Sequence, residues 1–351
     1  MDLLRQFIKV VFKHKHIREL EVFKDDGDKN NYVNLIKIDD MKTFSKYYSK
    51  ILSDFSQYHG KYAYRGFNNA SYRIYSSLQR SWRWNGLENL FKDHISYIKF
   101  QINKIGSLSI VRDYLHRNNV HDYNVLALIQ HYGGDSNLVD FTIDPNIALF
   151  FAFDKVVPSN KEDSLSNYVS LYSIDVEHPI LGGPKEVSEV GSVNMQVYLK
   201  NSTCKPTEDS VNGVLRNLSM PAYDKAYDGK IVHYGTNIYV PMFNYKSSNP
   251  ISNANLQAQS GIFFQSSSDD VPLEELFKEQ HQFLIDRILT CYDINKKLIP
   301  EIKRRYNINY QLCDIYPYIP QKRSLERAVR FSMVKLFVKF IFNGFRKISI
   351  H

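Results

Sequence analysis

Hydrophobic residues recur at steps of three and four along the first part of the chain, as they do on one face of a helix. This spacing predicts helices over residues 2–23, 40–58, 87–104, 107–118 and 122–132. The segment 25–31, rich in Asp, Gly and Asn, is expected to form a turn. Gly133-Gly134 should end the last of these helices, because glycine readily adopts the left-handed conformation that follows a helix.

The pattern then changes to the alternation and the β-branched or aromatic content that are typical of strands. Strands are predicted over residues 61–67, 138–142, 168–176 and 231–242. Pro145 is expected to begin a helix that runs to Phe153, since proline suits the first helical turn. Polar loops are expected over 155–167, 201–212 and 246–260, and further helices over 277–289, 293–306 and from 324 onward. The sequence therefore predicts an α+β fold with a small mixed β-sheet core and helical segments at both ends.

The positive charge of the chain lies at its two ends. Of the net charge of +8, residues 1–20 carry +3 and residues 321–351 carry +7, which leaves residues 21–320 at −2. A nucleic-acid groove in this nearly neutral region is disfavoured, because such grooves are strongly basic. We divide the chain into an N-terminal amphipathic helical segment (1–39), a central domain (40–320) and a basic amphipathic C-terminal helix (321–351).

Targeting and cysteine signals indicate a cytoplasmic protein without a metal site. Cys204, Cys291 and Cys313 provide neither a disulfide framework nor the spacing of metal ligands. The N-terminus lacks the features of a secretory signal, and no run reaches the ~18 apolar residues of a membrane span. Two interpretations of the C-terminal helix stay open. It packs on its own domain or on a protein partner, or it lies on an anionic membrane surface.

Three motifs, far apart in the sequence, place a polar group or a glycine beside an aromatic or branched run. They are Tyr64-Arg65-Gly66, the block Gln130-His131-Tyr132-Gly133 through Asp140-Phe141-Thr142 to Ala148-Leu149-Phe150-Phe151-Ala152, and Gln259-Ser260-Gly261-Ile262-Phe263-Phe264. Buried strands that end at a ligand pocket have this character. We therefore expect the three motifs to converge on one cavity.

Arg65 is the candidate anion-binding residue of the first motif. Its guanidinium can hold a phosphate, a ribose or a carboxylate through paired hydrogen bonds, and Gly66 permits close approach of the backbone. The alternative is a structural arginine paired with Asp140. Alternation places Asp140 and Thr142 on one face of their strand. We interpret Asp140 as a buried partner of Arg65 and Thr142 as a hydroxyl that faces the ligand.

His131 and Gln259 are the candidates for chemistry at the reacting part of a ligand. His131, at a helix end, can act as a general base or donate to a ligand hydroxyl. The alternative is a histidine that caps the helix carbonyls. Gln259 can contact a ribose hydroxyl or an amide, or bind backbone within a loop. A carboxamide does not ionise, so Gln259 cannot serve as a base.

The order of these motifs resembles the FRG domain family, named for its Phe/Tyr-Arg-Gly signature. The likeness spans roughly residues 40–320, and the block from His131 to Ala152 is its most specific part. This chain departs from the family at two places. Ser136-Asn137 stands where the family usually has Thr-Arg, and Asn255 stands where it usually has an arginine four residues before the glutamine.

A weaker likeness, at the level of fold, is to ADP-ribosyltransferases that bind NAD. It implies a similar sheet core and ADP-ribosyl transfer from NAD, with Arg65 on the pyrophosphate, Thr142 and His131 ordering the ribose and nicotinamide, Gln259 on the ribose hydroxyls, and Tyr64 or Tyr132 stacked on the nicotinamide. His131 and Gln259 are then the catalytic pair, and Gly66 and Asp140 complete the NAD-binding set. The alternatives are a non-catalytic module that binds a nucleotide, RNA or protein, for example within a bacterial defence or toxin system, and a structural scaffold.

Overall fold

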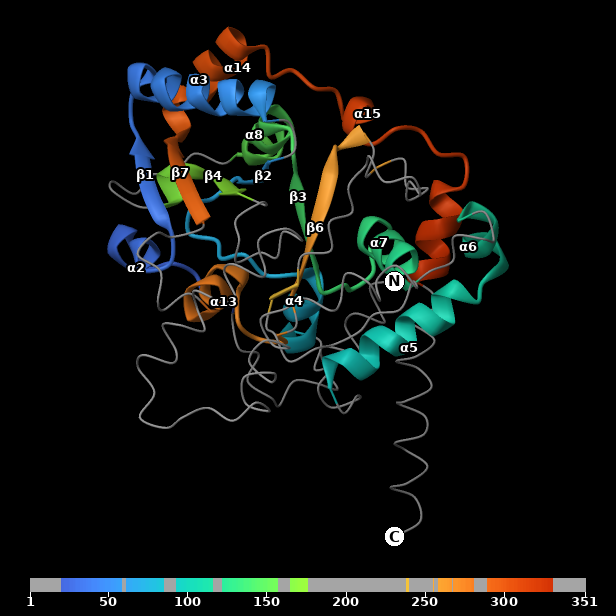
Figure 1. Cartoon of the computed structure of the whole chain (residues 1–351). Coiled ribbons are helices and arrows are strands. Elements are labelled where there is room, and N and C mark those ends of the chain that lie inside the picture. Colours follow the sequence, from blue (N-terminus) through green and yellow to red (C-terminus); the bar gives the residue numbers. More distant parts are fainter. Residues whose placement is uncertain are drawn as a thin grey trace, which may run out of the picture.

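The protein is built around a mixed β-sheet with helices on both faces (Figure 1). The structure is a computed structural model that describes residues 20–58, 61–84, 93–115, 122–156, 165–175, 238–239, 255, 258–266, 268–280 and 289–330. Seven strands in these ranges form one sheet in the order β1-β7-β4-β2-β3-β6-β5. Their bounds are Asn34–Ile38 (β1), Tyr62–Phe67 (β2), Leu138–Thr142 (β3), Tyr168–Asp175 (β4), Ile238–Tyr239 (β5), Gly261–Ser266 (β6) and Leu289–Asn295 (β7).

Helices in the described ranges flank this sheet. Their bounds are Asp26–Asn30 (α2), Met41–Gln57 (α3), Ser77–Trp84 (α4), His94–Gly106 (α5), Ser109–Tyr114 (α6), Asp122–His131 (α7), Pro145–Phe153 (α8), Leu273–Gln280 (α13), Ile299–Tyr306 (α14) and Leu312–Ile315 (α15). Residues 165–167 and 296–298 form short 3₁₀ turns, and residues 322–330 are helical. None of the helices in the described ranges combines the length and apolarity that a membrane crossing requires.

Alternation along the strands sends side chains into three hydrophobic clusters. One face of the sheet packs on α13 through residues such as Phe141, Tyr172 and Phe264. The other face is covered by α3, α8 and α14 over one half of the sheet. The helices α5, α6 and α7 form a further cluster against Leu138 and Phe263. The fold is therefore α+β with a mixed sheet, as the sequence predicted.

The sheet has a weak seam between β2 and β3. Strand β2 pairs with β4 along its whole length, but it pairs with β3 only through Tyr64 and Thr142. Strand β3 in turn pairs along its whole length with β6. The sheet therefore consists of two halves that meet at one residue pair, and the backbone groups beyond that pair lack a ladder partner across the seam. This seam is where the candidate site lies.

Gly66 lets helix α8 settle against the seam. A Cβ atom at Gly66 would lie 1.9 Å from the carbonyl oxygen of Ala148 and 2.7 Å from the nitrogen of Ala152. Side chains cannot reach such distances from backbone atoms, so only glycine permits this approach. Helix α8 begins as predicted, with Pro145 in its first turn and the Asp144 side chain accepting from the Asn146 nitrogen at 2.8 Å. The close approach that Gly66 permits is thus made by the backbone of α8.

The predicted elements over 40–58, 61–67, 107–118, 122–132, 138–142, 145–153 and 168–176 are confirmed to within a few residues in their described parts. Helix α5 begins at His94, and residues 85–92 lie outside the described ranges. Of the strand predicted over 231–242, only β5 is described. Residues 1–19 and 331–351 lie outside the described ranges, so the two terminal amphipathic helices stay predictions beyond residues 322–330, which are helical.

Other predictions were wrong for reasons of long-range pairing. Residues 20–23 are not helical, and Val22 bridges Tyr72 instead. Residues 293–295, predicted to be helical, and Leu289, predicted to end a helix, both belong to strand β7. The expected turn over 25–31 contains helix α2, whose buried Lys29 donates to Asp293 at 2.7 Å and to Ser170 at 2.8 Å. This distant ion pair holds a segment that looks like a turn in isolation.

Candidate functional site

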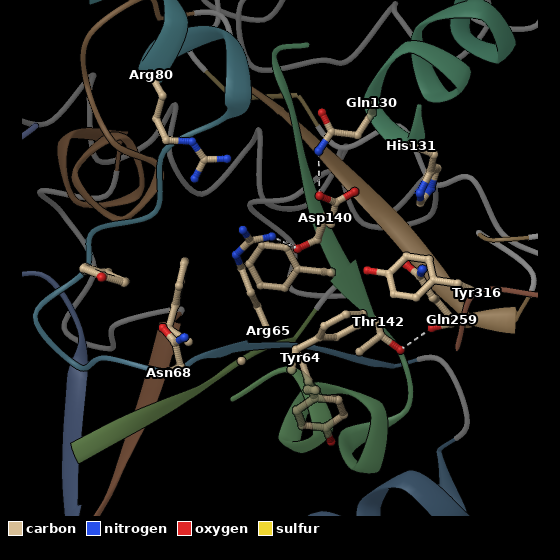
Figure 2. Close-up of a pocket in the computed structure, with 16 residues that line it drawn as sticks. Tyr64, Arg65, Asn68, Arg80, Gln130, His131, Asp140, Thr142, Gln259 and Tyr316 are labelled. Atoms are coloured by element: carbon tan, nitrogen blue, oxygen red, sulfur yellow. Dashed lines mark hydrogen bonds between the residues drawn. The ribbon is translucent and has the colours of Figure 1, made fainter. Parts of the chain in front are cut away.

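A cavity of about 440 Å³ lies at the seam between β2 and β3. It is lined by Tyr64, Arg65, Gly66, Phe67, Asn68, Tyr72, Arg80, Gln130, His131, Asp140, Phe141, Thr142, Ala148, Phe151, Gln259 and Tyr316. Figure 2 shows polar side chains from both halves of the sheet and from α4 and α7 facing one another across it. The three sequence motifs therefore do meet around one cavity, although they are separated by up to about 200 positions.

Arg65 lies at the centre of the pocket on the β2 side. One of its terminal nitrogens donates to the backbone carbonyl oxygen of Asp140, and its guanidinium stacks 4.8 Å from the centre of the Phe67 ring. Its Nε atom is buried and has no hydrogen-bond partner. Burial lowers the pKa of Arg65 to about 10, against the opposing effect of the Asp140 carboxylate, so the side chain stays charged at neutral pH.

Asp140 supplies the carboxylate of the pocket. The predicted pair between Arg65 and this carboxylate is not formed: Arg65 donates to the backbone carbonyl of Asp140, while the carboxylate oxygen Oδ2 accepts from the Gln130 side chain at 2.6 Å (Figure 2). Gln130 is itself oriented by Ser77, whose hydroxyl donates to it at 3.0 Å. The second carboxylate oxygen, Oδ1, is buried without a partner. One oxygen is thus fixed and the other is available to a donor in the cavity.

His131 is the last residue of α7 and faces the same cavity. Its ring packs 5.6 Å from the Phe263 ring, and its Nε2 atom is buried without a hydrogen-bond partner. Within the described ranges, no hydrogen bond joins this ring to a carbonyl of its helix, so the capping role finds no support. Burial lowers the pKa of His131, with a smaller opposing effect of Asp140. The imidazole is therefore neutral at pH 7 and able to accept a proton.

Thr142 and Gln259 line the pocket, but the Thr142 hydroxyl proton and one N–H of the Gln259 carboxamide already bind other groups of the protein. The Thr142 hydroxyl donates to the Gln259 carbonyl oxygen at 2.7 Å and accepts from the Asp144 nitrogen at 3.0 Å. The Gln259 side chain donates to the carbonyl oxygen of Ile315 at 3.2 Å. These bonds fasten β3, the loop before β6 and α15 to one another. Both groups thus form hydrogen bonds within the protein. The Thr142 hydroxyl, predicted to face the ligand, already donates its one proton to the Gln259 carbonyl oxygen.

The two candidate stacking residues differ in position. Tyr64 is buried under the pocket, with an exposed fraction of 1 %. Tyr132 does not line the cavity. It lies in the cluster of α5, α6 and α7, and its hydroxyl is 3.2 Å from that of Tyr114. Of these two tyrosines, Tyr64 is therefore the one that borders this cavity.

Arg80 and Tyr316 belong to the pocket and were missed from the sequence. Arg80 comes from α4, a helix that the hydrophobic pattern did not predict. Leu78 and Trp82, four residues apart and both buried, were the available signal of a helix there. Tyr316 follows α15, far from every motif, and its exposed fraction of 36 % places it at the mouth of the pocket. No local signal indicated this position.

The two departures from the FRG pattern contain neutral residues that bind backbone. The Asn137 side chain donates to the carbonyl oxygen of Ser266 at 2.9 Å, and the Ser136 hydroxyl accepts from the Leu138 nitrogen at 3.0 Å. The carbonyl oxygen of Asn255 accepts from the Gln259 nitrogen at 3.0 Å. The cations of the pocket are thus Arg65 and Arg80. No group of three or more His, Cys, Asp or Glu residues in the described ranges is placed to hold a metal ion.

Comparison with known proteins agrees with the motif analysis. The sequence model of the FRG domain family matches residues 60–161 of this chain. This stretch includes β2, α8 and all the pocket residues except Gln259 and Tyr316. No curated protein and no solved structure was found to match the chain. The matched stretch begins just before the Tyr64-Arg65-Gly66 motif and ends after the Phe-Phe-Ala block. Residues 60–161 of the chain are thus similar to the FRG domain.

Proposed function

We propose that the pocket binds a phosphate-bearing, nucleotide-like ligand, for which NAD is the most concrete candidate. The observation that carries this proposal is a set of three buried polar atoms without partners, Arg65 Nε, Asp140 Oδ1 and His131 Nε2, around one cavity. A buried polar atom without a partner costs about 1–3 kcal/mol. Each such atom calls for an explanation, and a ligand in the shared cavity would satisfy all three.

The size and lining of the cavity suit a small molecule with flat and charged parts. Its volume of about 440 Å³ lies in the range of small-molecule sites. Phe67 and Tyr72 form one edge-to-face aromatic pair beside it, and Phe151 and Tyr316 form another, each with ring centres 6.4 Å apart. Aromatic rings of this kind offer stacking surfaces to a base. Arg65 supports the phosphate, and the free oxygen of Asp140 can accept from a ribose hydroxyl.

ADP-ribosyl transfer from NAD is the catalytic form of this proposal. In it the bond between the ribose and nicotinamide breaks, nicotinamide leaves with the bonding electron pair, and an acceptor oxygen or nitrogen forms the new bond to the ribose. The neutral imidazole of His131 would take the proton that the acceptor loses. Asp140 would stabilise positive charge that develops on the ribose. Gln259 would hold the site together, as its bond to Ile315 supports.

Pure binding without transfer is the second candidate. It is favoured by the internal hydrogen bonds of the Thr142 hydroxyl and the Gln259 side chain, which bind these groups to the protein itself. A module of this type would respond to the concentration of a nucleotide. It would transfer no ADP-ribosyl group and would need no acceptor. Partners of the terminal segments, whether a protein or an anionic membrane, stay separate predictions.

Calorimetry and a transfer assay test both candidates. NAD and ADP-ribose are titrated into the wild-type protein, into Arg65→Gln and into the surface control Arg305→Gln, which changes a half-exposed arginine of α14 that pairs with Glu301. We expect binding to the wild type and to the control, and at least about tenfold weaker binding to Arg65→Gln. Equal affinity of Arg65→Gln would place the ligand elsewhere, and lack of wild-type binding at millimolar NAD would exclude NAD.

The transfer assay uses NAD labelled in its adenylate part and a cell extract as the source of acceptors. Label that becomes covalently attached with the wild type but not with His131→Gln supports the catalytic form. Binding without any attached label or released nicotinamide supports the binding module.

A further inference from the structure

Arg80, from α4, is a second cation of the pocket. Its side chain extends from α4 toward Arg65 and Asp140 (Figure 2). In the part of the chain that the structure describes, the guanidinium makes no hydrogen bond and no ion pair. Burial lowers the pKa of Arg80, and the carboxylates of Asp140 and Asp135 oppose this effect only in part. A partly buried cation in this state is stabilised by an anion that enters the cavity.

The lining carries more positive than negative charge. Arg65 and Arg80 face a single carboxylate, that of Asp140, and one oxygen of that carboxylate is already bound to Gln130. His131 adds no charge, because its lowered pKa keeps it neutral at pH 7. The two guanidiniums also act on each other, since the charge of Arg80 contributes to the lowered pKa of Arg65. An anion between them removes this repulsion.

The donors that remain free match two phosphoryl groups. Arg65 uses one terminal nitrogen on the Asp140 carbonyl, which leaves its Nε and the other terminal nitrogen for a pair of oxygens. Arg80 offers all five of its N–H donors. One guanidinium fork binds two oxygens of a single phosphoryl group. A diphosphate presents two such pairs of oxygens, one for each arginine, whereas a monophosphate can fill only one fork completely.

We infer that Arg80 and Arg65 form a two-arginine site that selects ligands with a diphosphate over ligands with a single phosphate. The inference rests on the proposed function and names its substrate class: diphosphate esters such as ADP, ADP-ribose or NAD. Arg80 is then the residue that decides between a diphosphate and a monophosphate, while Arg65 binds both. The two aromatic pairs, which also line the cavity, offer stacking surfaces to a flat group attached to the diphosphate.

Calorimetry with a matched set of ligands tests this selection. AMP, ADP and ADP-ribose are titrated into the wild-type protein, Arg80→Gln, Arg80→Lys and the surface control Arg305→Gln. For the wild type and the control, we expect ADP and ADP-ribose to bind about tenfold or more tightly than AMP. In Arg80→Gln the ratio should fall to about twofold, because AMP binding is retained through Arg65. Arg80→Lys keeps the charge without the fork and should give an intermediate ratio.

Two results would overturn the inference while the proposed function survives. The first is equal affinity of the wild type for AMP and ADP, and the second is an unchanged ratio in Arg80→Gln. Failure of all three ligands to bind the wild type overturns the proposed function itself, and the inference with it. Circular dichroism and thermal melting of each variant show whether it folds. Since the Arg80 side chain has no partner in the described part of the protein, its variants are expected to fold.

Discussion

Arg73 has an environment opposite to that of Arg65 and Arg80, although the three arginines lie within 16 positions of one another. Arg73, between β2 and α4, donates to Glu274 and Glu275 at 2.7 Å and to Glu21 at 3.3 Å, so each of its nitrogens has a carboxylate. Arg65 and Arg80 form no such ion pair among the described residues. Burial alone would lower the pKa of Arg73, but the Glu274 and Glu275 carboxylates raise it, whereas the pKa values of Arg65 and Arg80 are lowered.

This difference separates an arginine that stabilises the fold from arginines kept for a ligand. The chain evidently can surround a guanidinium with carboxylates, since it does so at Arg73, only a few residues from the pocket. The open donors of Arg65 and Arg80 are therefore a property of the site and not a general failure of packing. Charged groups without partners lower stability, and proteins maintain them where binding or chemistry needs them.

Removal of Arg73 should cause the largest loss of stability. Arg73→Met leaves the fully buried Glu274 carboxylate without its partner, which typically costs about 3–5 kcal/mol. Urea unfolding followed by circular dichroism measures this change. As a control, Arg305→Met on α14 should change the free energy of unfolding by less than about 0.5 kcal/mol, because its pair with Glu301 is half-exposed. A loss below about 1 kcal/mol in Arg73→Met would show that the two kinds of arginine do not differ.

Gly66→Ala should destabilise the protein by about 1–3 kcal/mol or more, because the new methyl group collides with the backbone of α8 at Ala148 and Ala152. The measurement is again urea unfolding. Gly27→Ala is the matched control, since Gly27 lies on α2 and its added methyl would meet only the Asp25 side chain at 3.2 Å. A mild effect at Gly66 on stability together with lost ligand binding would instead assign this glycine to the ligand.

Arg80→Met should leave the free energy of unfolding unchanged or raise it by up to about 1 kcal/mol, since it removes a cation without a partner. The same variant should lose its preference for diphosphates. Thermal melting with and without ADP separates the two effects, because the wild type should gain more stability than Arg80→Met at the same ADP concentration. If Arg80→Met loses more than about 2 kcal/mol, Arg80 belongs with Arg73 as a residue of the fold.

The pH dependence of stability should report on His131. Because burial lowers the pKa of His131 below its usual value of 6.5, the unfolded chain binds a proton that the folded protein resists. The stability due to the neutral ring is therefore present above pH 6.5 and decreases as the pH falls through the folded pKa. Unfolding measured at pH 7.5, 6.5 and 5.5 should show a shallower loss for His131→Gln than for the wild type. Parallel curves would contradict a buried, neutral imidazole.

Much of the fold could be predicted from local pattern because the relevant elements carry their own signals. Asp144-Pro145 marks the start of α8, and Gly133, with a φ of 84°, follows the end of α7. Strand β7 could not be predicted, because its buried Asp293 interrupts the apolar pattern and is stabilised by Lys29, 264 positions earlier. A local pattern cannot indicate such a partner. The same holds for β1, whose five residues pair only with β7 in the described part of the sheet.

The sequence predicted which residues line the site better than it predicted the hydrogen bonds that they form. The motifs led to Arg65, His131 and Asp140, which the structure brings together, since polar residues beside buried strands tend to meet at a cavity. The partners were not predictable. That Asp140 binds Gln130, and that Thr142 binds the carbonyl of Gln259, depends on how the halves of the sheet meet. Arg80 was not predicted, because nothing in the local sequence distinguishes it from other arginines and only the fold places it at the pocket.

The strand order has a consequence for synthesis on the ribosome. Strand β7, the last of the sheet in sequence, is inserted between β1 and β4, which precede it by more than 100 positions. Until residue 295 has left the exit tunnel, the apolar β4 has an unprotected edge and β1 has no neighbour in the described sheet. Exposed edges of this kind recruit other chains. During synthesis, this edge of β4 is therefore open to pairing with other chains until β7 has been made.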